Sequence, residues 1–286
     1  MMYIVWEWRL LDYATCIVLG LIGWLVGSFV WPHCRQFTFD DTSIRYEMQA
    51  KETFPTYSVI IAIILVLFIY AAGEYYTWRK HSRRIMLRHL NAWILVQAFS
   101  ICLEFCIVNL TKLYAGRLRP DFLQQMAEEG ITLATIGGFT ETQVCHAARE
   151  GRLSFPSGHS GSAFSGFVPL SLYLLGLTRA LRGGAFYRAI LAVLPMCFPI
   201  ITAISRTRDN DHHFADIVAG SVIGSACGIF AVALSFVPTR SGRWTLRESL
   251  SADERQSNSP GGDTEQETEL VDNLPPNCAR NADLPV

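Results

Sequence analysis

The chain has 286 residues, of which 50% are hydrophobic and only 17% are charged, and its formal net charge is −1. This composition is too poor in charge for an ordinary soluble protein of this size. It favours a membrane protein, and we expect no nucleic-acid partner.

Six apolar runs are long enough to cross a bilayer, whose core of about 30 Å requires roughly 20 helical residues. They cover residues 11–31, 54–72, 90–110, 157–177, 186–204 and 214–237. The first run is read as a retained anchor and not as a signal peptide, because Glu7 and Asp12 stand at its start. The sequence therefore predicts an all-α, polytopic membrane protein whose six transmembrane helices form a bundle.

The orientation of this bundle depends on Lys and Arg. The segments after the second and fourth runs are basic, which places them in the cytoplasm by the positive-inside rule. They carry Arg79, Lys80, Arg83, Arg84 and Arg88, and then Arg179, Arg182 and Arg188. The opposite face is nearly as basic, so the rule decides the orientation only if several cations on that face have another task.

The end of the chain differs from the rest. Residues 248–286 hold nine acidic residues against Arg255 and Arg280, and few residues that could build a core. Such a segment cannot offset the entropy of ordering. We expect a six-span domain over residues 1–240 and an acidic, disordered cytoplasmic tail over residues 241–286.

Most of the eight cysteines fall inside the apolar runs, where Cys packs as a small hydrophobic residue. Cys34 and Cys145 instead fall in loops on the non-cytoplasmic side. Oxidation is permitted there, so these two residues are candidates for a disulfide, with two free thiols as the alternative.

A first polar cluster follows the third apolar run, with Lys112, Arg117, Arg119 and Pro120. If the helix continues, Lys112 and Arg119 share one face because they are seven residues apart. A lone cation in such a place usually anchors the end of a span. Its meaning therefore depends on the other clusters.

The second cluster, Ser157-Gly158-His159, stands at the start of the fourth run. Unpaired backbone N–H groups at a helix start attract anions, and the Ser-Gly step leaves room for a phosphate oxygen to approach. A histidine at a membrane interface more often serves only as a hydrogen-bonded polar group.

The third cluster joins the last two runs and contains Arg206, His212 and Asp216. If the sixth helix begins near His212, this residue and Asp216 are one turn apart on one face. The carboxylate could then accept a hydrogen bond from one imidazole nitrogen and leave the other free as a nucleophile. The plain alternative is a polar loop with a helix-capping acid. All three clusters fall on the same side of the membrane, and together they supply what phosphoryl transfer requires.

With these residues the chain resembles the type 2 phosphatidic acid phosphatase superfamily, whose pattern is K-x6-RP, then PSGH, then SR-x5-H-x3-D. Two longer strings, at residues 116–120 and 150–159, resemble its lipid phosphate phosphatase branch. One departure is Phe214, where that branch often has Trp. The matching positions are Lys112, Arg119, Pro120, Pro156, Ser157, Gly158, His159, Ser205, Arg206, His212 and Asp216.

The resemblance implies a magnesium-independent phosphatase in which His212 is the nucleophile, His159 the acid and base, and Asp216 the partner of His212. It implies that the phosphate is held by Lys112, Arg119, Arg206, Ser157 and Gly158. No metal and no cofactor are implied, and no cluster of Asp and Glu beside the motifs could form a magnesium site.

The implied substrates are membrane lipid phosphates and water. The lipids are phosphatidate, lysophosphatidate, diacylglycerol pyrophosphate, and ceramide or sphingoid phosphates. The active site would be extracellular or luminal, in the plasma membrane or an endomembrane, and a homo-oligomer is compatible with the sequence.

Two other functions stay open. A lipid phosphotransferase would use a similar pair of histidines and an acid, although the intact Lys112 and Arg119 motif argues against it. A non-enzymatic anion transporter would use the same cations to line a path, with Glu104 in the third run as part of it. No repeat of the kind found in transporters is present, so Glu104 is read as a polar contact inside the bundle.

Overall fold

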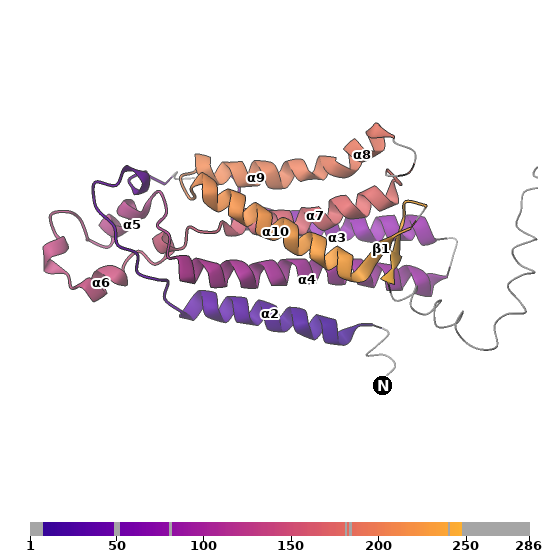
Figure 1. Ribbon diagram of the computed structural model, residues 1–286, viewed down its shortest axis with the longest axis horizontal. Helices are drawn as coiled ribbons and strands as arrows, with labels where there is room; N and C mark the ends of the chain where they lie inside the picture. Colours follow the sequence, from indigo (N-terminus) through magenta and orange to yellow (C-terminus); the bar gives the residue numbers. More distant parts are fainter. Residues whose placement is uncertain are drawn as a thin grey trace, which may run out of the picture.

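A computed structural model of the chain describes residues 8–48, 52–79, 82–180, 182, 185–239 and 241–247. Within them, six helical spans are long and apolar enough to cross a membrane, and they lie side by side (Figure 1). The spans are α2 (Leu10–Phe29), α3 (Thr56–Trp78), α4 (Arg83–Ala115), α7 (Gly158–Leu177), α8 with α9 (Phe186–Val193 and Cys197–Arg208, joined by the 3-10 turn η4, Leu194–Met196) and α10 (Phe214–Ser235). The predicted all-α bundle of six spans is confirmed, and the chain is a multi-pass membrane protein.

The third span differs most from its prediction. The apolar run covers residues 90–110, whereas α4 runs from Arg83 to Ala115 and has 33 residues. Hydropathy detects only the part that lies in hydrocarbon, but the flanking polar residues stay helical because their side chains reach the aqueous layers. As a result Lys112 lies on the helix itself, beyond the apolar run.

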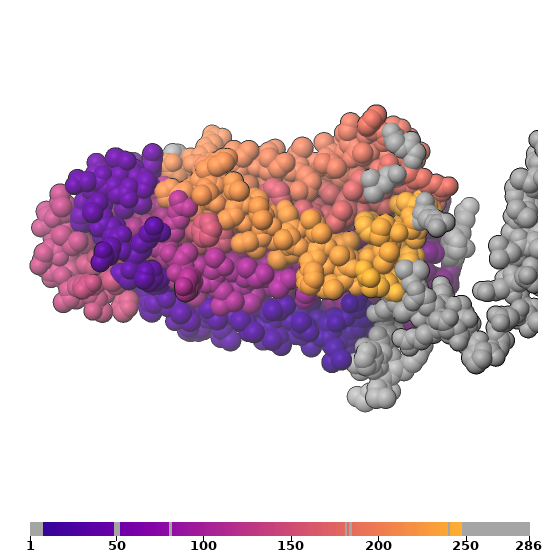
Figure 2. Space-filling view, viewed as in Figure 1, coloured from indigo at the N-terminus to yellow at the C-terminus, as the bar shows by residue number. Residues whose placement is uncertain are grey.

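The segments that join α2 to α3 and α4 to α7 fold together at one end of the bundle, on the left in Figure 2. We call this unit the extramembrane cap (residues 30–48 and 116–157). The cap has its own apolar core, and a disulfide between Cys34 and Cys145 joins its two segments. Its helical pieces are η1 (Thr42–Ile44), α5 (Phe122–Glu128), η2 (Ile136–Gly138), α6 (Glu141–Cys145) and η3 (Glu150–Arg152).

Two arginines of the cap bind backbone carbonyl groups. Arg152 is fully buried and donates to the carbonyl oxygens of Val144, Ala147 and Arg35 at 2.9, 3.2 and 3.3 Å. Arg149 donates to two carbonyl groups at the end of α2. These two cations therefore hold the cap together and fasten it to the bundle.

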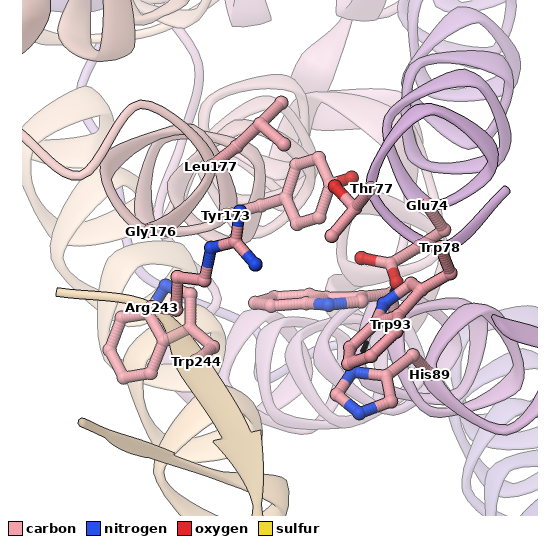
Figure 3. A pocket seen from close by; sticks show the side chains of 10 residues that line it. All are labelled: Glu74, Thr77, Trp78, His89, Trp93, Tyr173, Gly176, Leu177, Arg243 and Trp244. Carbon is pink, nitrogen blue, oxygen red and sulfur yellow. Dashed lines mark ion pairs between the residues drawn. The ribbon is translucent and has the colours of Figure 1, made fainter. Parts of the chain in front are cut away.

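The opposite end of the bundle is closed by a short antiparallel hairpin of β1 (Phe236–Pro238) and β2 (Trp244–Leu246). The indole N–H of Trp244 donates to the Leu172 carbonyl at 2.6 Å, and Phe236 stacks on Trp93 with ring centroids 4.1 Å apart. A cavity of about 40 Å³ remains between the hairpin and the helices, with Glu74 and Arg243 in its wall (Figure 3). Of the predicted tail, residues 241–286, only 241–247 are described, and the rest lies outside the described residues.

Helices α7 and α10 pack backbone against backbone. Gly220, Gly224 and Gly228 recur at intervals of four along one face of α10, which lets two helices approach closely. A Cβ atom on Gly220 would lie 2.3 Å from the Ser157 carbonyl oxygen, and one on Gly224 would lie 2.2 Å from that of Gly161. Neither position can accept a side chain unless the helices separate.

We expect Gly224→Ala to destabilise the protein by about 3 kcal/mol, because a backbone oxygen cannot move aside as a flexible side chain can. The measurement is the thermal unfolding midpoint in detergent. Gly137→Ala is the matched control, since a Cβ atom there would meet nothing within 4 Å. Alanine ordinarily favours a helix over glycine by roughly 1 kcal/mol, so an unchanged or higher midpoint for Gly224→Ala would contradict the close packing.

Candidate active site

The residues of the three sequence clusters come together in one site. The helix ends that carry them lie where the bundle meets the extramembrane cap (Figure 1). Lys112 lies in the last turn of α4, and Arg206 in the last turn of α9. His159 is in the first turn of α7, and Asp216 in the first turn of α10. Four helix ends thus supply the side chains, and the cap covers them.

The turn after α4 brings Arg117 and Arg119 to this place. The helix ends at Gly116, whose φ of 52° is left-handed, and a Cβ atom there would lie 2.1 Å from the His33 carbonyl oxygen. Both the left-handed backbone conformation and the close approach of the His33 carbonyl oxygen therefore require glycine at this position. The chain then runs beside residues 151–154, with the Arg119 N–H donating to the Gly151 carbonyl at 2.7 Å.

Asp216 is a fully buried acid whose oxygen atoms are already occupied. It accepts hydrogen bonds from Ser154 Oγ at 2.6 Å, Arg117 Nη1 at 2.8 Å and the His213 N–H at 3.0 Å. The Nδ1 atom of His212 lies 3.8 Å away, near enough for electrostatic attraction but too far for a hydrogen bond. The expected hydrogen bond between the imidazole and Asp216 is therefore absent, since α10 begins at Phe214 and His212 precedes the helix. Ser154 and Arg117, which do bond the acid, carry no signal in the sequence.

The other ring nitrogen of His212, Nε2, faces Asp211 at 3.3 Å. This carboxylate also pairs with Arg119 through Oδ1 and lies 3.8 Å from Arg206 through Oδ2. The cations expected to hold a phosphate therefore surround an acid of the chain itself. Asp211 is the main residue of the site that the sequence reasoning missed, and its position next to His212 is the one signal that could have indicated it.

Burial and the neighbouring charged groups shift the pKa values of His212 and Asp211. Burial lowers the pKa of His212 below its ordinary value, although the Asp216 and Asp211 carboxylates oppose the shift. Burial raises the pKa of Asp211, but the neighbouring positive groups, Arg119 first, outweigh it and hold this pKa below its ordinary value. Near neutral pH the site therefore combines a neutral imidazole with an ionised carboxylate.

Arg206 is fully buried and tightly held. Its Nη2 donates to Asp209 at 2.9 Å, and Asp209 in turn accepts two hydrogen bonds from Thr53. Nη1 of Arg206 lies 3.3 Å from Nε2 of His159, which also lies 3.2 Å from Thr56 Oγ1. Thr53 and Thr56, before and at the start of α3, thus help to fix Arg206 and His159 through contacts that span 156 and 103 positions, where no sequence motif could reveal them.

Gly158 and Ser157 have different surroundings. A Cβ atom on Gly158 would lie 3.6 Å from Nζ of Lys112, so the start of α7 faces a side chain that is predicted to bind the phosphate. The N–H of Ser157 instead donates to the Asp216 carbonyl at 2.9 Å, which fastens α7 to α10. The amides of Ser157 and Gly158 are both predicted to bind the phosphate, but the Ser157 amide already donates its hydrogen bond within the chain.

The metal-binding capacity of the site follows from its side chains. Among the described residues, no group of three or more His, Cys, Asp or Glu side chains is arranged to hold a metal ion. The acids near His212 are paired with arginines instead.

The chain is similar in sequence to known phosphatases. A family model described as PAP2 superfamily matches residues 91–240. The chain is 32% identical to a PA-phosphatase related-family protein of Dictyostelium discoideum, over 80% of each chain. It is 31% identical to Diacylglycerol pyrophosphate phosphatase 1 of Saccharomyces cerevisiae, over 81% of each, and to Lipid phosphate phosphatase 2 of Arabidopsis thaliana, over 79% of this chain and 77% of that one. No solved structure matches the chain at a significant level.

The position of Asp211 predicts competition with inorganic anions. We expect Asp211→Asn to bind orthophosphate or orthovanadate at least about tenfold more tightly, because the arginines lose their resident carboxylate. Calorimetric titration of the purified protein measures this affinity. Asp40→Asn, which removes the same charge from an exposed position, should leave the affinity unchanged. Equal affinities for Asp211→Asn and the unaltered protein would show that Asp211 does not occupy the anion site.

Proposed function

Because this chain belongs to the PAP2 superfamily and collects the residues described above in one site, we propose that it is a lipid phosphate phosphatase. It would hydrolyse the phosphomonoesters of phosphatidate and of related lipids. These include lysophosphatidate, diacylglycerol pyrophosphate, and ceramide or sphingoid phosphates. The names of its relatives in yeast and Arabidopsis support this substrate class.

The observation that carries the proposal is the placement of the Asp211 carboxylate. It lies against Nε2 of His212 and between two arginines, where the phosphoryl group of a substrate would have to lie for attack. An incoming phosphate would exchange with this carboxylate and take over its contacts. The position of Asp211 therefore supports the assignment of this place as the phosphate site.

In the proposed reaction, Nε2 of His212 attacks phosphorus while the bond from phosphorus to the lipid oxygen breaks. His159 gives a proton to the departing alkoxide, which leaves as the lipid alcohol. His159 then takes a proton from water, whose oxygen attacks the phosphohistidine and releases orthophosphate and the neutral imidazole of His212. Asp216 stabilises the positive charge that His212 carries in between, and each proton transfer contributes about 10²- to 10⁴-fold in rate.

The phosphate oxygens would be held by Lys112, Arg119 and Arg206 with the Gly158 amide. Fixed cations stabilise charge that moves during phosphoryl transfer, and they work best when they need not reorganise. The anchoring of Arg206 by Asp209 supplies such rigidity. Ser157 has a positioning role in this proposal, because its amide holds the Asp216 carbonyl. We propose that these cations replace a metal ion.

We propose that the site faces the extracellular or luminal side, with the six-span domain of residues 1–240 in the membrane and the acidic tail in the cytoplasm. The disulfide in the extramembrane cap supports this orientation, since such bonds persist in oxidising compartments. The positive-inside rule supports it as well. Arg117, Arg119 and Arg206 pair with acids, and Arg149 and Arg152 bind carbonyl groups, so these cations have another task.

The test of the reaction is phosphate release from phosphatidate in detergent micelles with excess chelator present. We expect the activity to survive the chelator, and His212→Ala to lower kcat by at least about 10³-fold. His146→Ala is the matched control, because His146 lies in the cap, where its ring contacts that of Trp31 with centroids 4.7 Å apart. Rapid quenching with radiolabelled substrate should trap a phosphoryl group on the unaltered protein and none on His212→Ala.

Loss of activity in chelator would overturn metal independence but leave the phosphatase standing. No phosphate release under any condition would favour the anion transporter, and transfer of the phosphate group to a second lipid would favour the phosphotransferase.

The pH dependence of kcat/KM should report the ionisation of His212 in the free enzyme. Burial lowers the pKa of His212, so activity should persist below the ordinary pKa of histidine and fall only when the imidazole becomes protonated. The Asp211 carboxylate raises this pKa, so Asp211→Asn should move the acid limb to lower pH. If the acid limb moved to higher pH in Asp211→Asn, its assignment to His212 would be contradicted. The same would follow if Asp40→Asn moved the limb by an equal amount.

A further inference from the structure

A cavity of about 280 Å³ leads from the candidate active site into the apolar part of the bundle. Lys112, Gly158 and His159 form its upper wall. Below them, the walls are apolar side chains of α3 and α4, among them Val59, Ile60, Ile63, Ile101, Phe105 and Val108. The cavity therefore continues the anion site with a surface suited to the hydrocarbon part of a substrate.

One ionisable side chain interrupts this apolar wall. Glu104 is only 1% exposed to solvent, and its Oε2 accepts a hydrogen bond from Ser162 Oγ at 3.0 Å. Its Oε1 lies over Gly161, where a Cβ atom would come within 2.1 Å of it. In the part of the chain that the structure describes, Ser162 is the one hydrogen-bond partner of this carboxyl group, so Oε1 has none, and Glu104 itself lines the cavity.

A buried carboxyl group with an unfilled hydrogen-bonding atom is costly, and its position needs a reason. Gly161 leaves room for Glu104, and Ser162 donates the one hydrogen bond that the carboxyl group accepts among the described residues. The reading of Glu104 as a polar contact inside the bundle accounts for Oε2 but leaves Oε1 unexplained.

The distance along the bundle between Glu104 and Lys112 follows from the residues of α7 that each of them contacts. Lys112 contacts this helix at Gly158, and Glu104 contacts it at Gly161 and Ser162. One turn of helix, about 5.4 Å, separates the two levels. When a phosphomonoester is held at Lys112, the carbon next to the phosphoester carbon reaches down by a comparable length.

We propose that Glu104 recognises a free hydroxyl group on the carbon adjacent to the phosphoester carbon. This inference rests on the proposed function and ranks its substrates: lipid phosphates with one hydrocarbon chain and a vicinal hydroxyl, as in lysophosphatidate, would be preferred. A hydroxyl group can donate a hydrogen bond to an ionised carboxylate and can accept one from a protonated carboxyl group, so it suits Glu104 in either form. The esterified position of a diacyl lipid offers acceptors only.

A site built to bond a hydroxyl group rejects an analogue that lacks it, because the buried polar group is then left unpaired. The test is kcat/KM of the full-length protein in micelles for lysophosphatidate and for its analogue with hydrogen in place of the hydroxyl. We expect the unaltered protein to favour lysophosphatidate by at least about tenfold. Glu104→Leu should remove this preference, and Glu104→Gln, which keeps a donor and an acceptor, should retain most of it.

The two-by-two comparison of protein and substrate isolates the contact. Asn109→Leu is the control, since Asn109 lies in the same cavity wall but donates to the Phe105 carbonyl at 2.9 Å. It should keep the preference of the unaltered protein.

Equal rates on the two lipids by the unaltered protein would overturn the proposal, and this result needs no variant to fold. A preference that persists unchanged in Glu104→Leu would also overturn it. If the unaltered protein released phosphate from neither lipid, the proposed phosphatase function itself would fail, which is a different result.

Discussion

The close crossing of α7 and α10 is the constraint on which the site depends. The glycines at 220 and 224 leave no side chain between the helices, so the carbonyl oxygens of Ser157 and Gly161 lie against the backbone of α10. The Ser157 N–H completes the contact by bonding to the Asp216 carbonyl. This crossing helps to bring together His159 and His212, which are 53 positions apart in the chain, as the proposed attack and protonation on one phosphoryl group would require.

A second constraint is the pairing of charge where little water is present. Arg206, Asp209, Asp211 and Asp216 are all buried, and an isolated charge in such a place would be very unfavourable. Each arginine here contacts a carboxylate, and each of these acids contacts an arginine. The network holds the cations in position before any substrate arrives, which is how preorganised electrostatic stabilisation works.

Much of this arrangement can be predicted from the sequence, for identifiable reasons. The spans follow from hydropathy, because hydrocarbon admits only apolar helix of sufficient length. Helical periodicity brings His212 and Asp216 near each other only in part, because α10 begins at Phe214 and His212 precedes it. Three other donors hold the acid, and the imidazole stays 3.8 Å away. The hold of Thr53 on Asp209 has no local signal, since it joins residues from two distant segments. The core of the extramembrane cap escaped prediction because its short helices have no long apolar period.

The Asp211 carboxylate affects how strongly the proposed site attracts anions that are dissolved in water. Because Asp211 pairs with Arg119 and lies close to Arg206, it would offset much of the field that these arginines project into the surrounding water, so free phosphate or chloride would gain little by entering the proposed site. Binding would be an exchange of one anion for another, in which the phosphoryl group alone would have only a small advantage. The rest of the free energy of binding must come from the part of the substrate that lies in the apolar cavity. On the proposed mechanism, the protein would therefore distinguish a phosphate that is anchored in a membrane from the same phosphate dissolved in water.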